Sequence, residues 1–128
     1  MTVWDTFDDD DAPALSKLLE KRIPVPTQLT DWIGRAAVCG AADCVRVLVE
    51  KGASLTASYE SGSSLLHLAM AFSGRARIVK TLLELGVDPH QTDGTGWNAL
   101  QWAVEWASDE HADDDDREIV DLIRAAME

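Results

Sequence analysis

The sequence predicts an all-α fold in which about three helix pairs stack as a solenoid behind a helical N-terminal cap. Three observations support this fold. In the run 78–83, apolar residues recur three and four positions apart, which is the spacing of one helix face. The octet GSSLLHLA (62–69) returns 34 residues later as GWNALQWA (96–103). Gly52 and Gly86 also lie 34 residues apart, and each follows an apolar helical pattern, as a C-terminal cap does.

The N-terminal cap is expected to occupy residues 1–27. Asp11 stands just ahead of Pro13, and an acidic residue before an early proline is a helix-start signal. Leucines at helical spacing then predict one short amphipathic helix over 13–21. Pro24 and Pro26 cannot continue that helix, so the chain should turn there into the next unit.

The repeats are expected at 28–59, 60–92 and 93–128, within one domain that covers 1–128. The second repeat has one extra residue between its helices, and Ser73 and Gly74 are the expected turn. In the last repeat an acidic connector, 108–116, separates the first helix from a second helix at 118–127. Each pair has an apolar face that it cannot cover alone, so neighbouring pairs must stack.

A known family shares this pattern. Leu66, His67 and Ala69 stand in the order of the ankyrin signature Thr-Pro-Leu-His-x-Ala, with Ser64 in place of its Thr and Leu65 in place of its Pro. The period of 33 to 34 residues is also that of ankyrin repeats. The chain therefore resembles the ankyrin-repeat family over nearly its whole length. The signature is poor in the first repeat, where Asp-Trp-Ile-Gly (31–34) stands in its place.

Composition and net charge restrict the kinds of partner and the cellular location to be expected. No run approaches the roughly 20 apolar residues of a membrane helix, so no membrane partner is expected. The N-terminus lacks a secretory signal, and two cysteines are too few for a disulfide framework, so a cytoplasmic location is expected. The formal net charge of −12 argues against nucleic acid and favours a basic protein partner. The alternative is that acidity only keeps the protein soluble.

No enzyme, cofactor or metal site is expected. The resemblance implies that His67 braces its turn and that His90 lies in an exit turn, while His111 falls in the connector. The spacing assembles no catalytic triad and no phosphate loop. Cys39 and Cys44 suit neither a redox pair nor a zinc site. Calcium binding by the connector stays an alternative, although the segment lacks the glycine and spacing of an EF-hand.

The resemblance implies a binding surface made of turn tips and first helices. Tyr59, Phe72, Trp97 and Trp106 are expected to be exposed there, and Trp102, which matches Leu68, to be in the core. Exposed aromatic side chains with an acidic rim are typical of a partner site, although the rings could instead fill gaps between units. The predicted partner-binding residues are Tyr59, Glu60, Ser63, Phe72, Asp93, Thr95, Trp97, Glu105, Trp106, Asp109, Glu110, Asp113, Asp114 and Asp115.

The expected function is a non-enzymatic module, monomeric when free, that captures and neutralises a basic protein. By size and charge the chain resembles ankyrin-type immunity proteins, the antitoxins that bacteria encode beside secreted toxins. A general adaptor or scaffold for an unrelated protein is the alternative, and an enzyme or metal-handling protein is the third hypothesis.

Overall fold

The computed structural model describes residues 2–22, 24–59, 62–73 and 75–128, and the regular elements among them are helical. In chain order these elements are α1 (Val3–Asp9), α2 (Ala12–Lys21), α3 (Pro26–Cys39), α4 (Ala42–Glu50), α5 (Leu65–Leu68), the π-helical turn η2 (Ala69–Ser73), α6 (Ala76–Leu85), α7 (Ala99–Ala107) and α8 (Asp114–Met127). The prediction of an all-α fold is confirmed.

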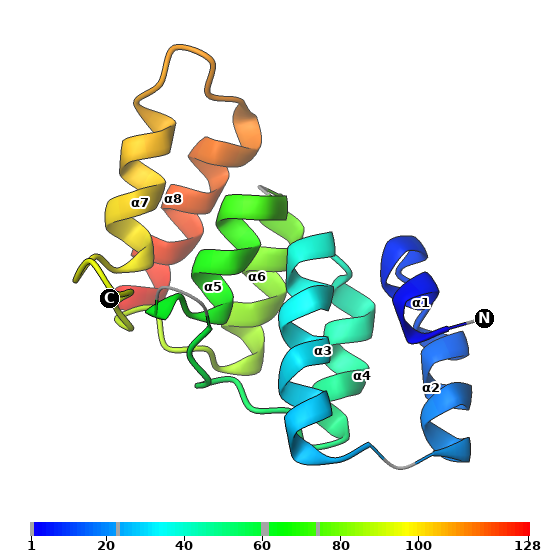
Figure 1. Ribbon diagram of the computed structural model, residues 1–128. Helices are drawn as coiled ribbons and strands as arrows, with labels where there is room; N and C mark the ends of the chain where they lie inside the picture. Colours follow the sequence, from blue (N-terminus) through cyan, green and yellow to red (C-terminus); the bar gives the residue numbers. More distant parts are fainter. Residues whose placement is uncertain (1, 23, 60–61, 74) are drawn as a thin grey trace.

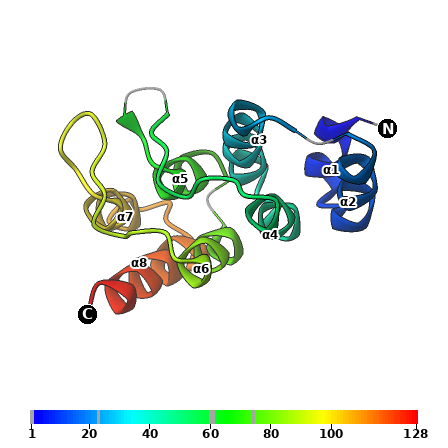
Figure 2. The ribbon, with the colours of Figure 1, turned by 90° about the horizontal axis from the view of Figure 1, so that it is seen from below.

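The helices stack as antiparallel pairs in two layers (Figures 1 and 2). Helices α3, α5 and α7 form one layer, and α4, α6 and α8 form the other. The pair α1 and α2 lies at one end of the stack, and α7 with α8 lies at the other. The loops that precede α5 and α7 project on the side of the first layer, so turn tips and first helices share one face of the molecule.

One continuous apolar core runs through the stack. Its fully buried side chains include Leu15 from the cap, Ile33 and Leu48 from the α3–α4 pair, Leu66 from α5 and Ile123 from α8. Small residues at equivalent positions of the first helices are also buried, namely Ala36, Ala69 and Ala103. Burial of apolar area between neighbouring pairs is what holds such a stack together.

The cap is a helix pair, so the prediction of a single helix was incomplete. Asp11 does cap α2, since its carboxylate accepts a hydrogen bond from the Ala14 amide at 3.2 Å. The missed helix, α1, begins with a capping box in which Thr2 and Asp5 bond each other's amides. The Phe7 side chain anchors α1 in the core. Residues 3–11 include five aspartates, so the apolar contribution of Phe7 was not recognised from the sequence.

The extra residue of the second repeat is absorbed inside a helix. Helix α5 continues into η2, whose wider turn takes up one more residue than an α-helical turn does. The expected turn at Ser73 and Gly74 is therefore corrected at Ser73, which ends η2, and Gly74 lies outside the described residues. The division into a cap and repeats at 28–59, 60–92 and 93–128 stays a prediction, and α3 begins at Pro26, ahead of the first of those boundaries.

The last helix begins earlier than predicted. Helix α8 starts at Asp114, where Asp113 and Asp116 form a capping box, and the acidic run supplies its first turn. Carboxylates there face the positive end of the helix dipole, so residues that look like a loop by composition favour a helix start.

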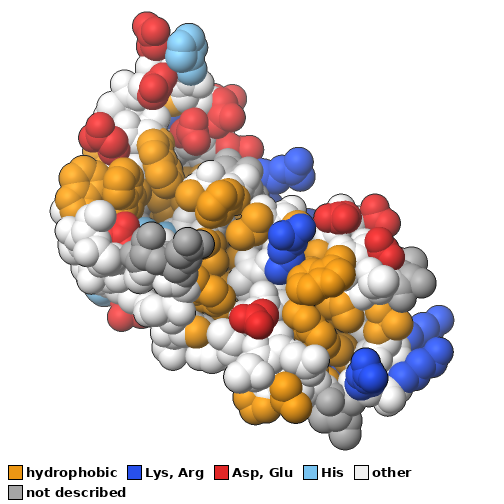
Figure 3. Space-filling view, in the orientation of Figure 1, with side chains coloured by type: hydrophobic (Ala, Val, Ile, Leu, Met, Phe, Trp, Pro, Cys, Tyr) orange, Lys and Arg blue, Asp and Glu red, His pale blue; other side chains and the backbone are white. Residues whose placement is uncertain are grey.

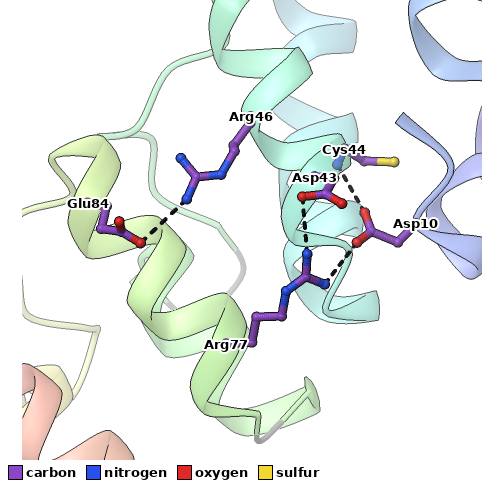
Figure 4. A network of polar contacts seen from close by, with 6 residues as sticks. All are labelled: Asp10, Asp43, Cys44, Arg46, Arg77 and Glu84. Atoms are coloured by element: carbon purple, nitrogen blue, oxygen red, sulfur yellow. Dashed lines mark hydrogen bonds and ion pairs between the residues drawn. The ribbon is translucent and has the colours of Figure 1, made fainter. Parts of the chain in front are cut away.

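Polar contacts join three successive units in the layer of α4 and α6 (Figure 4). The Arg77 guanidinium lies 3.2 Å from the Asp10 carboxylate and 3.1 Å from that of Asp43. Asp10 also accepts a hydrogen bond from the Cys44 amide at 3.0 Å. Asp10 has the left-handed conformation, with φ of 50°, that ends α1 and turns the chain into α2.

Candidate functional site

The turn before α7 is organised by the carboxylate of Asp93. It accepts hydrogen bonds from the Thr95 hydroxyl, from the Thr95 amide at 2.9 Å and from the Trp97 amide at 3.2 Å. Its other oxygen accepts from the indole nitrogen of Trp102 at 2.7 Å. The Thr95 hydroxyl, followed by the Trp102 indole, lowers the pKa of Asp93 to about 2. Asp93 therefore holds Trp97, a residue of the predicted surface, and Trp102, which was expected in the core.

Three indole rings follow one another beside this turn. The centroids of Trp97 and Trp102 are 4.7 Å apart, and those of Trp102 and Trp106 are 5.7 Å apart with an interplanar angle of 28°. Trp102 is half-buried, so its expected place in the core is corrected. Trp97 and Trp106 are half-buried as well, so the expectation that these two rings are exposed is also corrected. The ring lies at the boundary because its N–H group needs a polar partner, and Asp93 provides one at the surface.

The preceding turn places Tyr59 differently from its tryptophan counterparts. The Tyr59 hydroxyl donates a hydrogen bond to the Thr30 carbonyl at 2.8 Å, and its ring packs on Gly34 of α3. A Cβ atom at Gly34 would lie 2.7 Å from the Tyr59 ring, so only glycine admits the ring there. Burial raises the pKa of Tyr59 to about 12. This half-buried ring fits the alternative that an aromatic side chain fills a gap between units.

Neighbouring turns are linked to each other and to α5. The Ser64 amide and hydroxyl lie 3.3 Å and 2.6 Å from His67 Nδ1, which makes Nδ1 the acceptor. His67 Nε2 then donates to the Trp97 carbonyl at 3.1 Å. Gly62, at φ of 74°, approaches the next tip so closely that a Cβ atom would lie 2.7 Å from the Gly94 nitrogen. His67 thus braces the turns, as the family resemblance implied.

The face formed by these turns and the first helices is hollowed in three places. The N-terminal hollow, of about 530 Å³, is lined by Trp4, Asp31, Gly34, Arg35, Val38, Tyr59 and Leu68. The central hollow, of about 170 Å³, is lined by Ser63, His67, Leu68, Ala71, Phe72, Asp93, Trp102 and Trp106. The C-terminal hollow, of about 710 Å³, is lined by Met70, Ala71, Phe72, Glu105, Trp106, Asp109, His111, Ala112 and Asp116.

The three hollows adjoin one another because they share lining residues, and together they are called the groove. Leu68 lines both the N-terminal and the central hollow, and Phe72 and Trp106 line both the central and the C-terminal hollow. Figure 3 shows hydrophobic side chains in a broken band across this face. Phe72 is 67% exposed, which is unusual for a large apolar side chain, and it lines two of the three hollows.

The negative charge is concentrated in the last helix pair of the stack. Residues 105–128 contain ten carboxylate side chains and two arginines, and thus eight of the twelve net negative charges of the chain. Figure 3 shows acidic side chains gathered around the end where α7 leads into α8. Two of these acids have basic neighbours, since Asp114 pairs with Arg117 at 3.3 Å and Glu110 lies 3.4 Å from His111.

The structure brings only part of the predicted binding set together. Phe72, Glu105, Trp106 and Asp109 share the C-terminal hollow, Ser63 and Asp93 line the central one, and Tyr59 lies in the N-terminal one. Glu60 lies outside the described residues. Thr95, Trp97, Glu110, Asp113, Asp114 and Asp115 belong to the described turn and connector but to none of these three linings.

Sequence reasoning missed several residues of the groove. Trp4 and Arg35 line the N-terminal hollow, with the Arg35 guanidinium carbon 5.8 Å from the Trp4 ring centroid. Trp102, His111 and Asp116 were also missed. The first turn of α8 could have been recognised from Asp113 and Asp116, whose spacing of three residues is that of a capping box.

The cysteines are free thiols within the stack. Cys44 is buried and its Sγ lies 3.3 Å from the Thr6 carbonyl, while Cys39 is half-buried. Burial raises the pKa of both thiols, that of Cys44 to about 12. Among the described residues, no three His, Cys, Asp or Glu side chains are grouped as metal ligands. No helix in the described part of the chain combines the length and apolar character needed to span a membrane.

Comparison with known proteins shows where the chain belongs. A family model described as ankyrin repeats in three copies matches residues 33–113. An 87-residue stretch is 37% identical to the E3 ubiquitin-protein ligase hecd-1 of Caenorhabditis elegans, and it covers 68% of this chain and 3% of that protein. A putative ankyrin repeat protein of Pyrobaculum aerophilum is 43% identical over 70 residues, 55% of this chain and 25% of that protein.

The chain thus spans a small part of the length of either relative. Ankyrin repeats are generally non-catalytic modules of protein–protein interaction, which agrees with a groove whose lining includes apolar side chains. The stacked helix pairs, the braced turns and a family match over more than half of its length show that this chain belongs to the ankyrin repeat family.

Proposed function

We propose that this chain is a non-enzymatic binding protein that captures and neutralises a basic protein partner in its groove. The observation that carries the proposal is that the exposed Phe72 ring and the half-buried Trp106 ring lie together with carboxylates at an acidic end of the molecule. Phe72 and Trp106 line the same hollow as Glu105, Asp109 and Asp116.

The two components of the site serve different steps of binding. The acidic end attracts a basic partner and accelerates its encounter, an effect that falls with ionic strength. Aromatic side chains buried at the contact slow dissociation, because Trp and Tyr are among the most frequent hot-spot residues of interfaces. An apolar centre within a charged rim is also the usual anatomy of a specific interface.

In its most specific form, the proposal is that the protein is a cytoplasmic immunity protein that inhibits a secreted bacterial toxin. The resemblance that suggests this role is one of size and charge, with a formal net charge of −12 in 128 residues. A nucleic-acid-cleaving toxin, for example, needs a basic surface to bind its substrate, and an acidic groove would compete for that surface.

The alternative is an adaptor that holds an unrelated protein, and the N-terminal hollow favours it. The charged residues that line this hollow are one acid and one base, Asp31 and Arg35, so the hollow is balanced in charge. A partner seated there against Trp4 and Tyr59 would bind mainly through apolar contact. Its association would then depend little on salt.

The test identifies the partner and then measures the kinetics of its binding to this chain. Proteins that the immobilised chain captures from the native cells would first be purified. The rate at which each associates with this chain would then be measured at about 10 mM and about 100 mM salt. Over this range the electrostatic screening length falls from about 30 Å to about 10 Å. We expect a basic partner whose association rate constant falls at least about tenfold over this range. Expression of the partner alone should arrest growth, and co-expression with this chain should restore it.

A partner that binds at the same rate at both salt concentrations would contradict capture by charge and support the adaptor. A basic partner that binds by charge, but is harmless with or without this chain, would contradict the neutralising role alone.

A further inference from the structure

Aromatic rings and carboxylates together line the C-terminal hollow, and we infer that this hollow binds an arginine side chain of the partner. This inference rests on the proposed capture of a basic protein and names the group that would be recognised. The occupant follows from charge complementarity, since Glu105, Asp109 and Asp116 line the hollow and acidic side chains gather around the adjoining connection between α7 and α8 (Figure 3).

Two aromatic side chains form part of its wall. Phe72 is 67% exposed, and Trp106 lines both this hollow and the central one. Trp106 is held in place by stacking on Trp102, with centroids 5.7 Å apart. A planar guanidinium gains energy over the face of such a ring, and Trp is the strongest partner for it.

Three carboxylates complete the lining. Glu105 comes from α7, Asp109 follows the end of α7, and Asp116 lies in the first turn of α8. One oxygen of Asp109 accepts from the His111 amide at 2.8 Å, and one oxygen of Asp116 accepts from the Asp113 amide at 3.0 Å. These bonds orient two of the acids. Glu105 makes no hydrogen bond or ion pair with the described residues, so its carboxylate is the one without a structural task.

Both contacts that the inference requires already occur inside this protein. The Arg35 guanidinium carbon lies 5.8 Å from the centroid of the Trp4 ring, on the same groove. The Arg77 guanidinium bridges two carboxylates from different units, at 3.2 Å and 3.1 Å (Figure 4). The C-terminal hollow offers aromatic rings and carboxylates together but contains no arginine of its own among the residues of its lining.

This combination distinguishes arginine from lysine. The guanidinium group is planar and more weakly hydrated than an ammonium group. Its N–H donors can bond to two carboxylates while its face stacks on an aromatic ring. Ammonium is a compact and strongly hydrated charge, so it responds mainly to the acidic field. A site that merely attracts cations would bind both equally.

The inference is tested with two peptides of equal charge, fluorescently labelled hexa-arginine and hexa-lysine, titrated with the full chain at low salt and followed by anisotropy. We expect the arginine peptide to bind about tenfold more tightly than the lysine peptide.

Three variants locate the binding. Glu105→Gln removes one charge from the hollow, and Glu50→Gln is the matched control because it removes the same charge from the exposed end of α4. Phe72→Leu keeps an apolar side chain and removes a ring that is mostly exposed, so the fold should tolerate it. Glu105→Gln and Phe72→Leu should each weaken the arginine peptide about fivefold, and Glu50→Gln should change it less than about twofold. Circular dichroism would verify that each variant is folded.

Equal binding of the two peptides, or equal weakening by Glu105→Gln and Glu50→Gln, would overturn the arginine pocket and leave capture by charge intact. Failure of both peptides to bind at low salt would overturn the arginine pocket and also the proposed attraction of a basic partner.

Discussion

The turn tips are held by side-chain hydrogen bonds that join each turn to a helix of the first layer. The Tyr59 hydroxyl bonds to Thr30 of α3, and His67 bonds to the carbonyl of Trp97 in the next turn. Asp93 joins its own turn to the indole of Trp102. The groove therefore exists in a defined shape before any partner binds, which reduces the ordering cost of association.

Gly34→Ala should test the contact between α3 and Tyr59. The new Cβ atom would lie 2.7 Å from the Tyr59 ring, so we expect a loss of about 1–3 kcal/mol from overpacking, partly offset by about 1 kcal/mol from better helix propensity. In a Tyr59→Ala background the clash is absent, and the same substitution should stabilise the protein. Urea unfolding of the four proteins gives the comparison. A similar effect of Gly34→Ala in both backgrounds would show that Tyr59 does not pack there.

Asp93→Asn should alter how stability depends on pH. The pKa of Asp93 is about 2 in the folded protein, below its ordinary value of 3.8. The ionised carboxylate therefore stabilises the fold above about pH 4, and this contribution is lost as the pH falls through about 2. We expect the variant to melt at a lower temperature at neutral pH, and the difference from the original protein to shrink below about pH 4. A difference that stays constant down to pH 2 would contradict this role.

At the scale of elements, two irregular segments shape the acidic end of the groove. The π-helical turn η2 takes up one additional residue and carries Phe72, the most exposed ring of the groove. The acidic run 113–116 starts α8, and Asp116 from its first turn lines the C-terminal hollow. In both cases a departure from the regular repeat, an added residue or an acidic run, places a side chain in the lining of the C-terminal hollow.

Asp113→Ala should therefore destabilise the last helix. The Asp113 carboxylate accepts a hydrogen bond from the Asp116 amide at 2.9 Å, and the loss of such a cap costs about 1 kcal/mol. Glu110→Ala is the matched control, because it removes the same charge from the exposed connector without touching a cap. Urea unfolding should show a lower midpoint for Asp113→Ala than for Glu110→Ala. Equal midpoints would mean that only the charge matters.

At the scale of the whole molecule, the distribution of charge opposes the packing of the stack. Eight of the twelve net negative charges lie in residues 105–128, and they repel one another when the helices pair. The Arg77 bridge between Asp10 and Asp43 opposes this repulsion, but its guanidinium side chain is 63% exposed. Exposed ion pairs contribute only about 0–1 kcal/mol, so repulsion should dominate the response to salt.

The melting temperature should accordingly rise as salt increases from about 10 mM to about 100 mM, because screening weakens the repulsion among the carboxylates. A variant with Asp114→Asn and Asp115→Asn has two fewer of these charges, so its melting temperature should rise less. Differential scanning calorimetry would measure both. A fall in melting temperature with added salt would show that the ion pairs outweigh the repulsion.

The sequence by itself determined the helix pairs of the three repeats and their period. Apolar spacing and turn glycines act within one or two turns of the chain, so they can be recognised from neighbouring residues, as at 78–83 and Gly86. The acidic, aromatic character of the last repeat is likewise a property of composition. These features predicted the solenoid, and they indicated Phe72, Glu105 and Trp106 as residues of one surface.

Only the tertiary structure decided which rings turn inward and where the groove opens. Tyr59 bonds to a residue 29 positions away, and Arg77 reaches Asp10 across 67 positions. Trp102 lies at the boundary between core and surface because its indole N–H donates a hydrogen bond to Asp93. Trp4 lines the groove because α1 packs beside α3. Such pairings depend on close packing between units that are distant in sequence, and no local pattern encodes which partner each side chain will meet.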